Sequence, residues 1–205
     1  MYLAVIAAGL FAGFVNTLAG SGSLITLPLL MFLGLPANIA NGTNRIGVFV
    51  QSLVSSISFK KQKLYTVGES LWMSVPAIAG ALLGSLIAVK INERMMELLI
   101  GGLLVFMFFV ILYKPEQWVR DHAHSPAMKR RWWVPVVFFI IGIYGGFIQA
   151  GVGFFLLAAL VLGTGMGLTR ANAHKVLIVA AMTAIALVVF IISDQVYYLY
   201  GIILA

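Results

Sequence analysis

The chain has 205 residues, of which 62% are hydrophobic and only 9% are charged, and its formal net charge is +7. A soluble domain is about 25% charged, so this composition excludes an ordinary soluble protein and indicates a polytopic membrane protein in a lipid bilayer. The basic residues lie in short clusters between apolar segments, a pattern that indicates membrane topology and argues against a nucleic-acid partner. The absence of cysteine excludes disulfides and thiolate metal sites.

Apolar segments follow one another along the chain. Four are long enough to span a bilayer, at 39–59, 66–89, 95–113 and 171–193. Two pairs are shorter, 1–18 with 22–35 and 134–150 with 152–166, and a last segment covers 197–205. Because a helix of about 14 residues rises only about 21 Å, each pair is predicted to be either two half-depth helices that meet at mid-membrane or two tilted short spans. The first segment lacks a basic start and a cleavage site, so we interpret it as retained structure rather than a signal peptide.

The charged loops predict the orientation of these segments. Loop 60–65 carries three lysines and loop 114–133 carries five lysine and arginine residues. Two spans separate these loops, so both lie on one side, which the positive-inside tendency makes cytoplasmic. Loop 90–97 mixes both signs and loop 193–196 carries only Asp194, so both are predicted to lie outside, together with the N-terminus.

The sequence also contains an internal repeat. A shift of 133 residues aligns 9–72 with 142–205 without a gap, and glycines coincide, with Gly9, Gly13 and Gly20 matching Gly142, Gly146 and Gly153. An odd number of segments precedes the second copy, so the copies cross the bilayer in opposite directions, as in many secondary transporters.

The chain is therefore predicted to be an all-α polytopic membrane protein with two inverted-topology repeats, each opening with a broken helical hairpin followed by full spans. The first repeat covers 1–113, with its hairpin at 1–35 and three further spans, and 114–133 is a cytoplasmic loop. The second repeat covers 134–205 and stops partway into a span, so we expect about 40 residues to be missing at its C-terminus.

The motif NTLAGSGSLITLP at 16–28 interrupts an apolar run with polar residues, glycines and a proline. Gly20, Ser21 and Gly22 propagate a helix poorly, and Ser21 or Ser23 is expected to cap the helix that follows. At mid-depth that helix start would direct free N–H groups and a partial positive charge toward the membrane centre, where an anion is a suitable partner. The motif QAGVGFF at 149–155 would place a second helix start opposite it. The alternative is a kink or close helix packing through small residues.

Two basic residues lie inside apolar segments, Arg45 in IANGTNRIGV and Lys175 in ANAHKVLIV, whereas all six acidic residues lie at or near span ends. Intramembrane charges are costly and usually functional, so the predicted counter-charge is a transported anion. The alternative is that both side chains snorkel to the membrane surface. The shift of 133 pairs Lys175 with Gly42 and Arg45 with Ile178. Polar neighbours complete the set: Asn41, Thr43 and Asn44 beside Arg45, His174 beside Lys175, and Asn16 with Gln149 at equivalent hairpin positions.

Other polar and aromatic residues are assigned to the membrane surface. Arg170 is interpreted as a topological charge close to the interface. His122 and His124 lie in the polar loop, where they lack the further ligands of a metal site. Trp118, Trp132 and Trp133 are expected to be interface anchors.

The run AGFVNTLAGSGSLITLPLLMFLGLPANIANGTNRIGVFVQS resembles the signature of the TauE/SafE family of sulfite exporter-like membrane transporters, and GIYGGFIQAGVGFFLLAALVLGTGMGLTRANAHKVLI resembles the second motif of that family. The resemblance covers nearly the whole chain. It implies two inverted repeats in the bacterial inner membrane and transport of sulfite or of an organosulfonate such as sulfoacetate. It points to Asn16, Ser21, Gly22, Ser23 and Thr26 in the first hairpin, and to Asn41, Asn44, Arg45 and Lys175 beyond it. Family members usually have about eight spans, so this chain is expected to be short at its C-terminus.

The second hairpin is more apolar than the first, with Phe154 and Phe155 opposite Ser21 and Gly22. A symmetric site is therefore not expected, and the first motif is predicted to bind the ion while the second mainly seals it.

We accordingly predict a secondary transporter that exports a small sulfur oxoanion by alternating access around a central cationic site. The predicted binding residues are Asn16, Gly20, Ser21, Gly22, Ser23, Thr26, Asn41, Asn44, Arg45, Gln149, His174 and Lys175. No metal or cofactor is expected, the choice of anion and the oligomeric state stay open, and His174 leaves proton coupling open. A passive anion channel shares the same electrostatics. A membrane-embedded enzyme would need a pair such as Ser21 with His174, because the chain has no intramembrane carboxylate pair and no HExxH motif.

Overall fold

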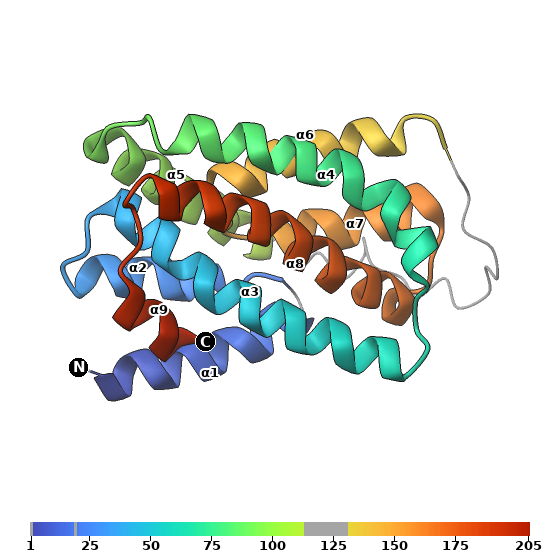
Figure 1. Cartoon of the computed structure of the whole chain (residues 1–205), viewed down its shortest axis with the longest axis horizontal. Helices are drawn as coiled ribbons and strands as arrows, with labels where there is room; N and C mark the ends of the chain where they lie inside the picture. Colours follow the sequence, from blue (N-terminus) through green and yellow to red (C-terminus); the bar gives the residue numbers. More distant parts are fainter. Residues whose placement is uncertain (1, 19, 113–130) are drawn as a thin grey trace.

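The computed structural model describes residues 2–18, 20–112 and 131–205, and within these ranges the regular elements are all helices (Figure 1). Their bounds are α1 Tyr2–Leu18, α2 Ser23–Phe32, α3 Ala37–Lys61, α4 Val67–Ala88, α5 Glu93–Leu112, α6 Val134–Phe147, α7 Val152–Thr164, α8 Leu168–Ile192 and α9 Tyr198–Leu204. Each predicted apolar segment thus coincides with one helix. The predictions for Lys114, Trp118, Arg120, His122, His124, Lys129 and Arg130 concern residues outside the described part of the chain.

The long helices have the lengths that a membrane crossing requires. Helices α3 and α8 have 25 residues each, α4 has 22 and α5 has 20. At about 1.5 Å per residue, each is at least as long as the hydrocarbon core, which is about 30 Å thick. Two of the described helices, Gly68–Ala88 and Leu168–Ile192, are both long enough and apolar enough to cross a membrane. Large apolar side chains cover the outside of the bundle, and Phe32, Leu98 and Leu10 expose 88%, 70% and 74% of their surface.

The two short pairs form broken hairpins that meet at their tips. Helices α2, α6 and α7 have only 10, 14 and 13 residues, too few to cross a bilayer. The chain reverses at Gly20 and Gly151, whose φ angles of +75° and +73° lie in the left-handed region that glycine adopts without strain. The N–H of Gly153 donates to the carbonyl oxygen of Gly20 at 3.2 Å. This contact favours two opposed half-depth hairpins over two pairs of tilted spans.

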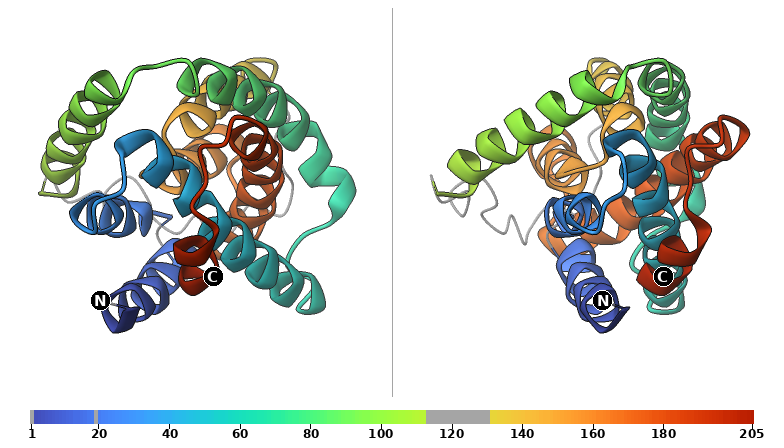
Figure 2. Two further views of the ribbon diagram at one scale, coloured as in Figure 1. Left: turned by 60° about the vertical axis from the view of Figure 1, so that its left-hand side comes forward. Right: turned by 90° about the vertical axis from the view of Figure 1, so that its left-hand side faces the viewer.

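The loops that the sequence analysis assigns to one side of the membrane lie at one end of the molecule. Loop 60–65 and residues 131–133 lie at one end of the bundle, and the start of α1 and loop 193–197 lie at the other (Figure 1). Helices α3 and α8 run in opposite directions between these ends. Helix α5 leans away from the rest of the bundle (Figure 2).

From the tips onward, helix bounds and left-handed glycines recur 131 residues apart, which differs from the predicted shift of 133. Helix α3 covers 37–61 and α8 covers 168–192, and both bounds differ by 131. The left-handed glycines Gly20 and Gly34 recur as Gly151 and Gly165 with the same difference. In the correct register AGSG aligns with AGVG, so Lys175 corresponds to Asn44 and Arg45 to Val176. In the first helix of each hairpin the glycines align at a shift of 133. The second hairpin therefore has two residues fewer than the first between these glycines and the tip.

The two halves are joined by close helix packing. Helix α4 crosses α6 through Gly80, Gly84, Gly142 and Gly146, and a Cβ atom added at any of these would lie only 2.0–2.3 Å from a carbonyl oxygen of the opposite helix. Small residues allow this backbone approach within a bilayer, where burial of apolar surface does not drive helix association. Helix α8 packs against both α3 and α4, which places the second half against the first along most of its length.

Candidate functional site

The first tip is organised by side-chain amides. The Asn16 Oδ1 atom accepts a hydrogen bond from the Gly22 N–H at 2.7 Å, and its Nδ2 donates to Gln51 Oε1 at 3.0 Å. The N-cap of α2 is Gly22, and neither Ser21 nor Ser23 makes the predicted capping bond. The Gly22 N–H is one of the groups at this helix start that were predicted to bind an anion, and it already donates a hydrogen bond to Asn16.

Helix α3 supports α2 just behind this tip. The Asn44 Nδ2 atom donates to Ser23 Oγ at 2.9 Å, and Thr26 Oγ1 donates to Asn44 Oδ1 at 2.5 Å. All three side chains are buried. They fix the direction of α2, and with it the position of the first tip.

The second tip uses aromatic and backbone contacts in place of most of these amides. The Tyr144 hydroxyl donates to the Ala150 carbonyl oxygen at 2.5 Å, and its ring lies edge-on to Phe155 with centroids 5.4 Å apart. Gln149 donates through Nε2 to Thr183 Oγ1. Its Oε1 atom is buried and has no hydrogen-bond partner among the residues that the structure describes.

Lys175 is buried at the end of α1 and does not snorkel to the membrane surface. Only 1% of its surface is exposed, and its Nζ donates to the carbonyl oxygens of Asn16 and Thr17, each at 3.2 Å. The last carbonyls of a helix lack partners within the helix and carry a partial negative charge, so an ammonium group is stabilised there.

Arg45 occupies the corresponding place at the end of α6. Its guanidinium donates to the carbonyl oxygens of Gly145, Gly146 and Phe147 at 3.2, 2.7 and 3.4 Å. Its Cζ lies 4.5 Å from the centroid of the Phe190 ring, and Asn41 Nδ2 also donates to Phe147 O at 2.8 Å. The end of α6 thus places a partial negative charge beside Arg45, and a transported anion as its counter-charge stays a prediction. Each half thus caps the broken helix of the other.

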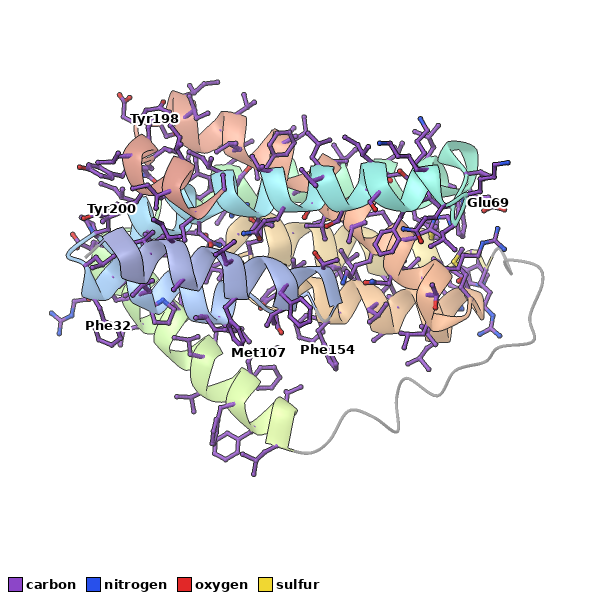
Figure 3. The ribbon with its side chains drawn as sticks, turned by 90° about the horizontal axis from the view of Figure 1, so that it is seen from below. Phe32, Glu69, Met107, Phe154, Tyr198 and Tyr200 are labelled. Carbon is purple, nitrogen blue, oxygen red and sulfur yellow. The ribbon has the colours of Figure 1, made fainter. Side chains whose placement is uncertain are left out.

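A small cavity lies where the two tips meet. Its volume is about 10 Å³, which is roughly the space for one water molecule. The lining residues come from both hairpins and from α3 and α8: Asn16, Gly20, Ser23, Val48, Ser52, Gln149, Val152, Gly153, Lys175, Val176 and Val179. Five of the predicted site residues are among them, namely Asn16, Gly20, Ser23, Gln149 and Lys175. Figure 3 shows Phe154 beside this junction, near the middle of the molecule.

A family model described as "Sulfite exporter TauE/SafE" matches residues 5–205. The chain belongs to the TauE/SafE family. Its relatives include "Probable membrane transporter protein ORF9" of Sinorhizobium sp, 29% identical over 82% of this chain and 63% of the relative. A "Probable membrane transporter protein" of Haemophilus influenzae is 24% identical over 94% of this chain and 75% of the relative. YfcA of Escherichia coli, also a "Probable membrane transporter protein", is 26% identical over 94% of this chain and 71% of the relative.

The chain thus spans 63% to 75% of the length of these relatives. No solved structure matches it significantly. The names of the family and of the relatives indicate a membrane transporter.

Several residues predicted for the site of this TauE/SafE protein lie outside its cavity. Thr26 and Asn44 lie behind the cavity wall, where they support Ser23, and the Gly22 N–H binds Asn16. Asn41 and Arg45 bind the end of α6. Ser21 is partly buried beside the tip but does not line the cavity.

His174 belongs to a separate polar cluster. Its Nδ1 lies 2.8 Å from Ser70 Oγ, and its Nε2 lies 3.7 Å from Glu69 Oε2. Glu69 in turn forms a two-point ion pair with Arg170 at 2.7 and 2.9 Å, so Arg170 is more than a topological charge. Figure 3 shows Glu69 at one end of the molecule, away from the tips. The Ser21–His174 pair that an enzyme would need is therefore not formed, and the described ranges contain no group of three metal-binding side chains.

Sequence reasoning missed the cavity residues on the full helices. Ser52 lies seven positions after Arg45, two helical turns further along α3, and Val48, Val176 and Val179 lie at helical spacing around the same point. A helical projection of α3 and α8 through Asn44 and Lys175 would have identified this set.

Proposed function

We propose that this TauE/SafE protein is a secondary transporter that exports a small sulfur oxoanion, either sulfite or an organosulfonate such as sulfoacetate. The anion binds in the cavity at the tips, and the two halves move around it by alternating access. The observation that carries the proposal is the meeting of two opposed hairpin tips beside a buried ammonium group, Lys175, that lines the cavity.

The electrostatics at the tips favour an anion. At each tip a helix C-terminus and a helix N-terminus converge, and their partial charges are opposite. Lys175 and Arg45 neutralise the two C-terminal ends. Helices α1, α2, α3, α6, α7 and α8 contain no aspartate or glutamate. The potential left at the cavity is therefore positive, and an anion balances it.

We infer that the two halves are inverted copies, with the first repeat at 1–113, a cytoplasmic loop at 114–133 and the second repeat at 134–205. The common difference of 131 residues and the opposite directions of α3 and α8 support this relation. The cavity admits about one water molecule in this conformation, which corresponds to a closed state. Entry of the ion then requires that the contact between Gly20 and Gly153 opens.

The proposed binding set has two layers. Asn16, Ser23, Ser52, Gln149 and Lys175 supply the polar contacts to the anion, and Gly20 lets the backbone approach it. The unpartnered Oε1 of Gln149 marks an amide that can turn its Nε2 toward an oxoanion. Ser21, Gly22, Thr26 and Asn44 shape the first tip, and Asn41 and Arg45 hold the second.

Counterflow in proteoliposomes tests the proposal. Vesicles preloaded with unlabelled sulfite or sulfoacetate should accumulate the labelled anion faster than empty vesicles, because a carrier exchanges its solute across the membrane. Saturable uptake with counterflow supports the carrier. Flux that does not saturate and shows no counterflow would instead identify a passive anion channel, and absence of flux for both anions would refute the substrate class.

A further inference from the structure

The ends of the two broken helices are occupied by two different basic groups. In transporters built from broken helices, the C-terminal ends of half-helices coordinate the coupling cation. Here the side chain of Lys175 places an ammonium group at the end of α1, with Asn16 O and Thr17 O as acceptors. Arg45 places a guanidinium at the end of α6.

The chemistry of these groups differs in a way that matters for coupling. Arginine stays protonated in proteins, whereas the pKa of a lysine shifts readily when the side chain is buried, so a buried lysine can lose its proton. Lys175 lines the cavity, and Arg45 is fully buried and lines no part of it. The group that can change its charge is therefore the one that faces the space where the solute binds.

We infer that Lys175 carries a coupling proton, so that one proton crosses the membrane with each anion. This inference rests on the proposed function. The anion binds while Lys175 is an ammonium ion. After the anion leaves, the ammonium passes one proton to water on the same side, and the neutral amine returns through the empty carrier. It takes a proton from water on the opposite side before the next anion binds, so a monoanion moves without net charge.

The surroundings of Lys175 contain few groups that compete for this role. Helix α8 packs against α1, α3, α4, α6 and α7. Helices α1 and α7 carry no charged residue or histidine. The other helices packed against α8, and α8 itself, carry the following titratable or charged groups: Arg45, Lys60 and Lys61 on α3, Glu69 on α4, Tyr144 on α6, and Arg170 and His174 on α8.

Each of these groups is engaged elsewhere or lies at a helix end. Arg45 binds the end of α6 and Tyr144 binds Ala150 O. Glu69 binds Arg170 and lies 3.7 Å from His174. Lys60 and Lys61 are exposed in the last turn of α3. His174, the residue that its sequence context favours for proton coupling, thus lies in the Glu69 cluster and not at the cavity.

The test compares net transport with exchange in proteoliposomes that contain the pH-sensitive dye pyranine. Labelled sulfite and sulfoacetate are each supplied outside, with protein-free vesicles as the blank for leakage of sulfur dioxide. Anion uptake and internal acidification are recorded together, and counterflow is measured on the same preparation. The variants are Lys175→Arg, which keeps the positive charge permanently, His174→Gln, and Lys60→Arg as a matched control at the exposed end of α3.

In the parent protein, acidification should follow anion uptake at about one proton per anion. Lys175→Arg should lower the ratio of net uptake to exchange at least about tenfold, because an empty carrier with a permanent charge does not return readily. Lys60→Arg should keep the parent ratio. Three results would overturn the assignment of the coupling proton to Lys175. They are anion uptake without acidification, a Lys175→Arg variant with the same ratio of net uptake to exchange as the parent, and loss of coupling in His174→Gln alone. Net uptake without acidification would contradict only this inference, whereas absence of exchange in the parent would contradict the proposed function.

A measurement on the parent protein alone covers the case in which Lys175→Arg does not fold. Sulfite or sulfoacetate is mixed with detergent-solubilised protein in weakly buffered solution between about pH 5 and pH 10, a range that reaches from the pKa of deeply buried lysines to near the ordinary lysine pKa. Binding should take up a fraction of a proton per anion that approaches one as the pH rises. Binding without proton uptake across the whole range would overturn the inference.

Discussion

The two hairpin tips touch each other, yet different interactions hold them. Side-chain amides and hydroxyls hold the first tip, where Asn16 binds Gly22 and Asn44 binds Ser23. At the second tip, Tyr144 binds a backbone carbonyl and stacks edge-on against Phe155. The two tips therefore differ in chemistry, although the chain reverses at a left-handed glycine in each of them. The first tip presents the polar side chains of Asn16 and Ser23 to the cavity, and the second presents Gln149 together with Val152 and Gly153.

The same asymmetry extends to the basic residues. Both cap a broken helix of the opposite half, but only Lys175 reaches the cavity. We therefore expect substitutions at Lys175 to act on transport and substitutions at Arg45 to act on folding. The following variants test this division of roles.

The largest effect is expected from Lys175→Met. It removes the ammonium group from the cavity, and loss of one close charge partner of a bound ion costs about 2–5 kcal/mol, so anion exchange should fall about 100-fold or more. Methionine has a similar length, and removal of a buried charge offsets part of the cost of leaving the carbonyl oxygens of Asn16 and Thr17 without their donor, so exchange is compared per amount of folded protein. Exchange in proteoliposomes measures the effect, with Lys60→Met as the control on an exposed lysine. A Lys175→Met protein that exchanges sulfite and sulfoacetate like the parent would show that the anion does not meet this residue.

Arg45→Met should instead weaken the fold. It leaves the carbonyl groups of Gly145 and Gly146 buried without their donor, which costs about 1–3 kcal/mol for each unsatisfied group. The midpoint of thermal unfolding in detergent should fall clearly, and Arg45→Lys should recover part of the loss. An unchanged midpoint together with a weakened anion affinity would reverse the roles assigned to the two basic residues.

Gly153→Ala tests the contact between the tips. A Cβ atom at residue 153 would lie 2.4 Å from the Cα of Gly20, so the tips must move apart at a cost of about 1–3 kcal/mol. Gly101 on α5 is the matched control, because a Cβ atom there meets nothing within 4 Å. Thermal unfolding should separate the two variants, with Gly101→Ala at or slightly above the parent. Equal midpoints for both variants would mean that the tips do not stay in contact.

The smallest effect is expected from Glu69→Gln. The Glu69–Arg170 ion pair joins α4 to α8, but about a third of each side chain is exposed. A pair of this kind contributes about 0.2–1 kcal/mol, and the amide still accepts one hydrogen bond. The unfolding midpoint should fall slightly, and added salt should reduce the difference from the parent. A loss as large as that of Arg45→Met would show that this cluster, and not the tips, holds the two halves together.

The sequence was sufficient to predict the helices and the broken hairpins, because both depend on local features. Apolar segments set helix lengths, and Gly20 and Gly151 provide turns that other residues resist. The spacing of 131 residues was not predicted, because the glycines in the first helix of each hairpin align at a shift of 133, whereas AGSG and AGVG align at 131.

The partners of the basic residues were beyond sequence reasoning for a physical reason. Arg45 binds Gly145 and Gly146, about a hundred residues away, and only the packing of α3 against the end of α6 brings them together. Hydropathy and spacing indicate that a buried charge needs compensation, but they do not distinguish a solute from helix carbonyls. Lys175 lines the cavity between the tips, and its role in binding an anion stays a prediction.

The most direct test of the account is a structure of the protein bound to selenite, the heavier analogue of sulfite, with the anomalous signal of selenium recorded. Because a charge-assisted hydrogen bond joins N and O atoms about 2.7–2.9 Å apart, selenium should lie within about 4 Å of Lys175 Nζ, between Asn16, Ser23 and Gln149. A selenium peak beside Arg45, at a lipid-facing surface, or absent at saturating selenite would contradict the claim that the tips form the anion site.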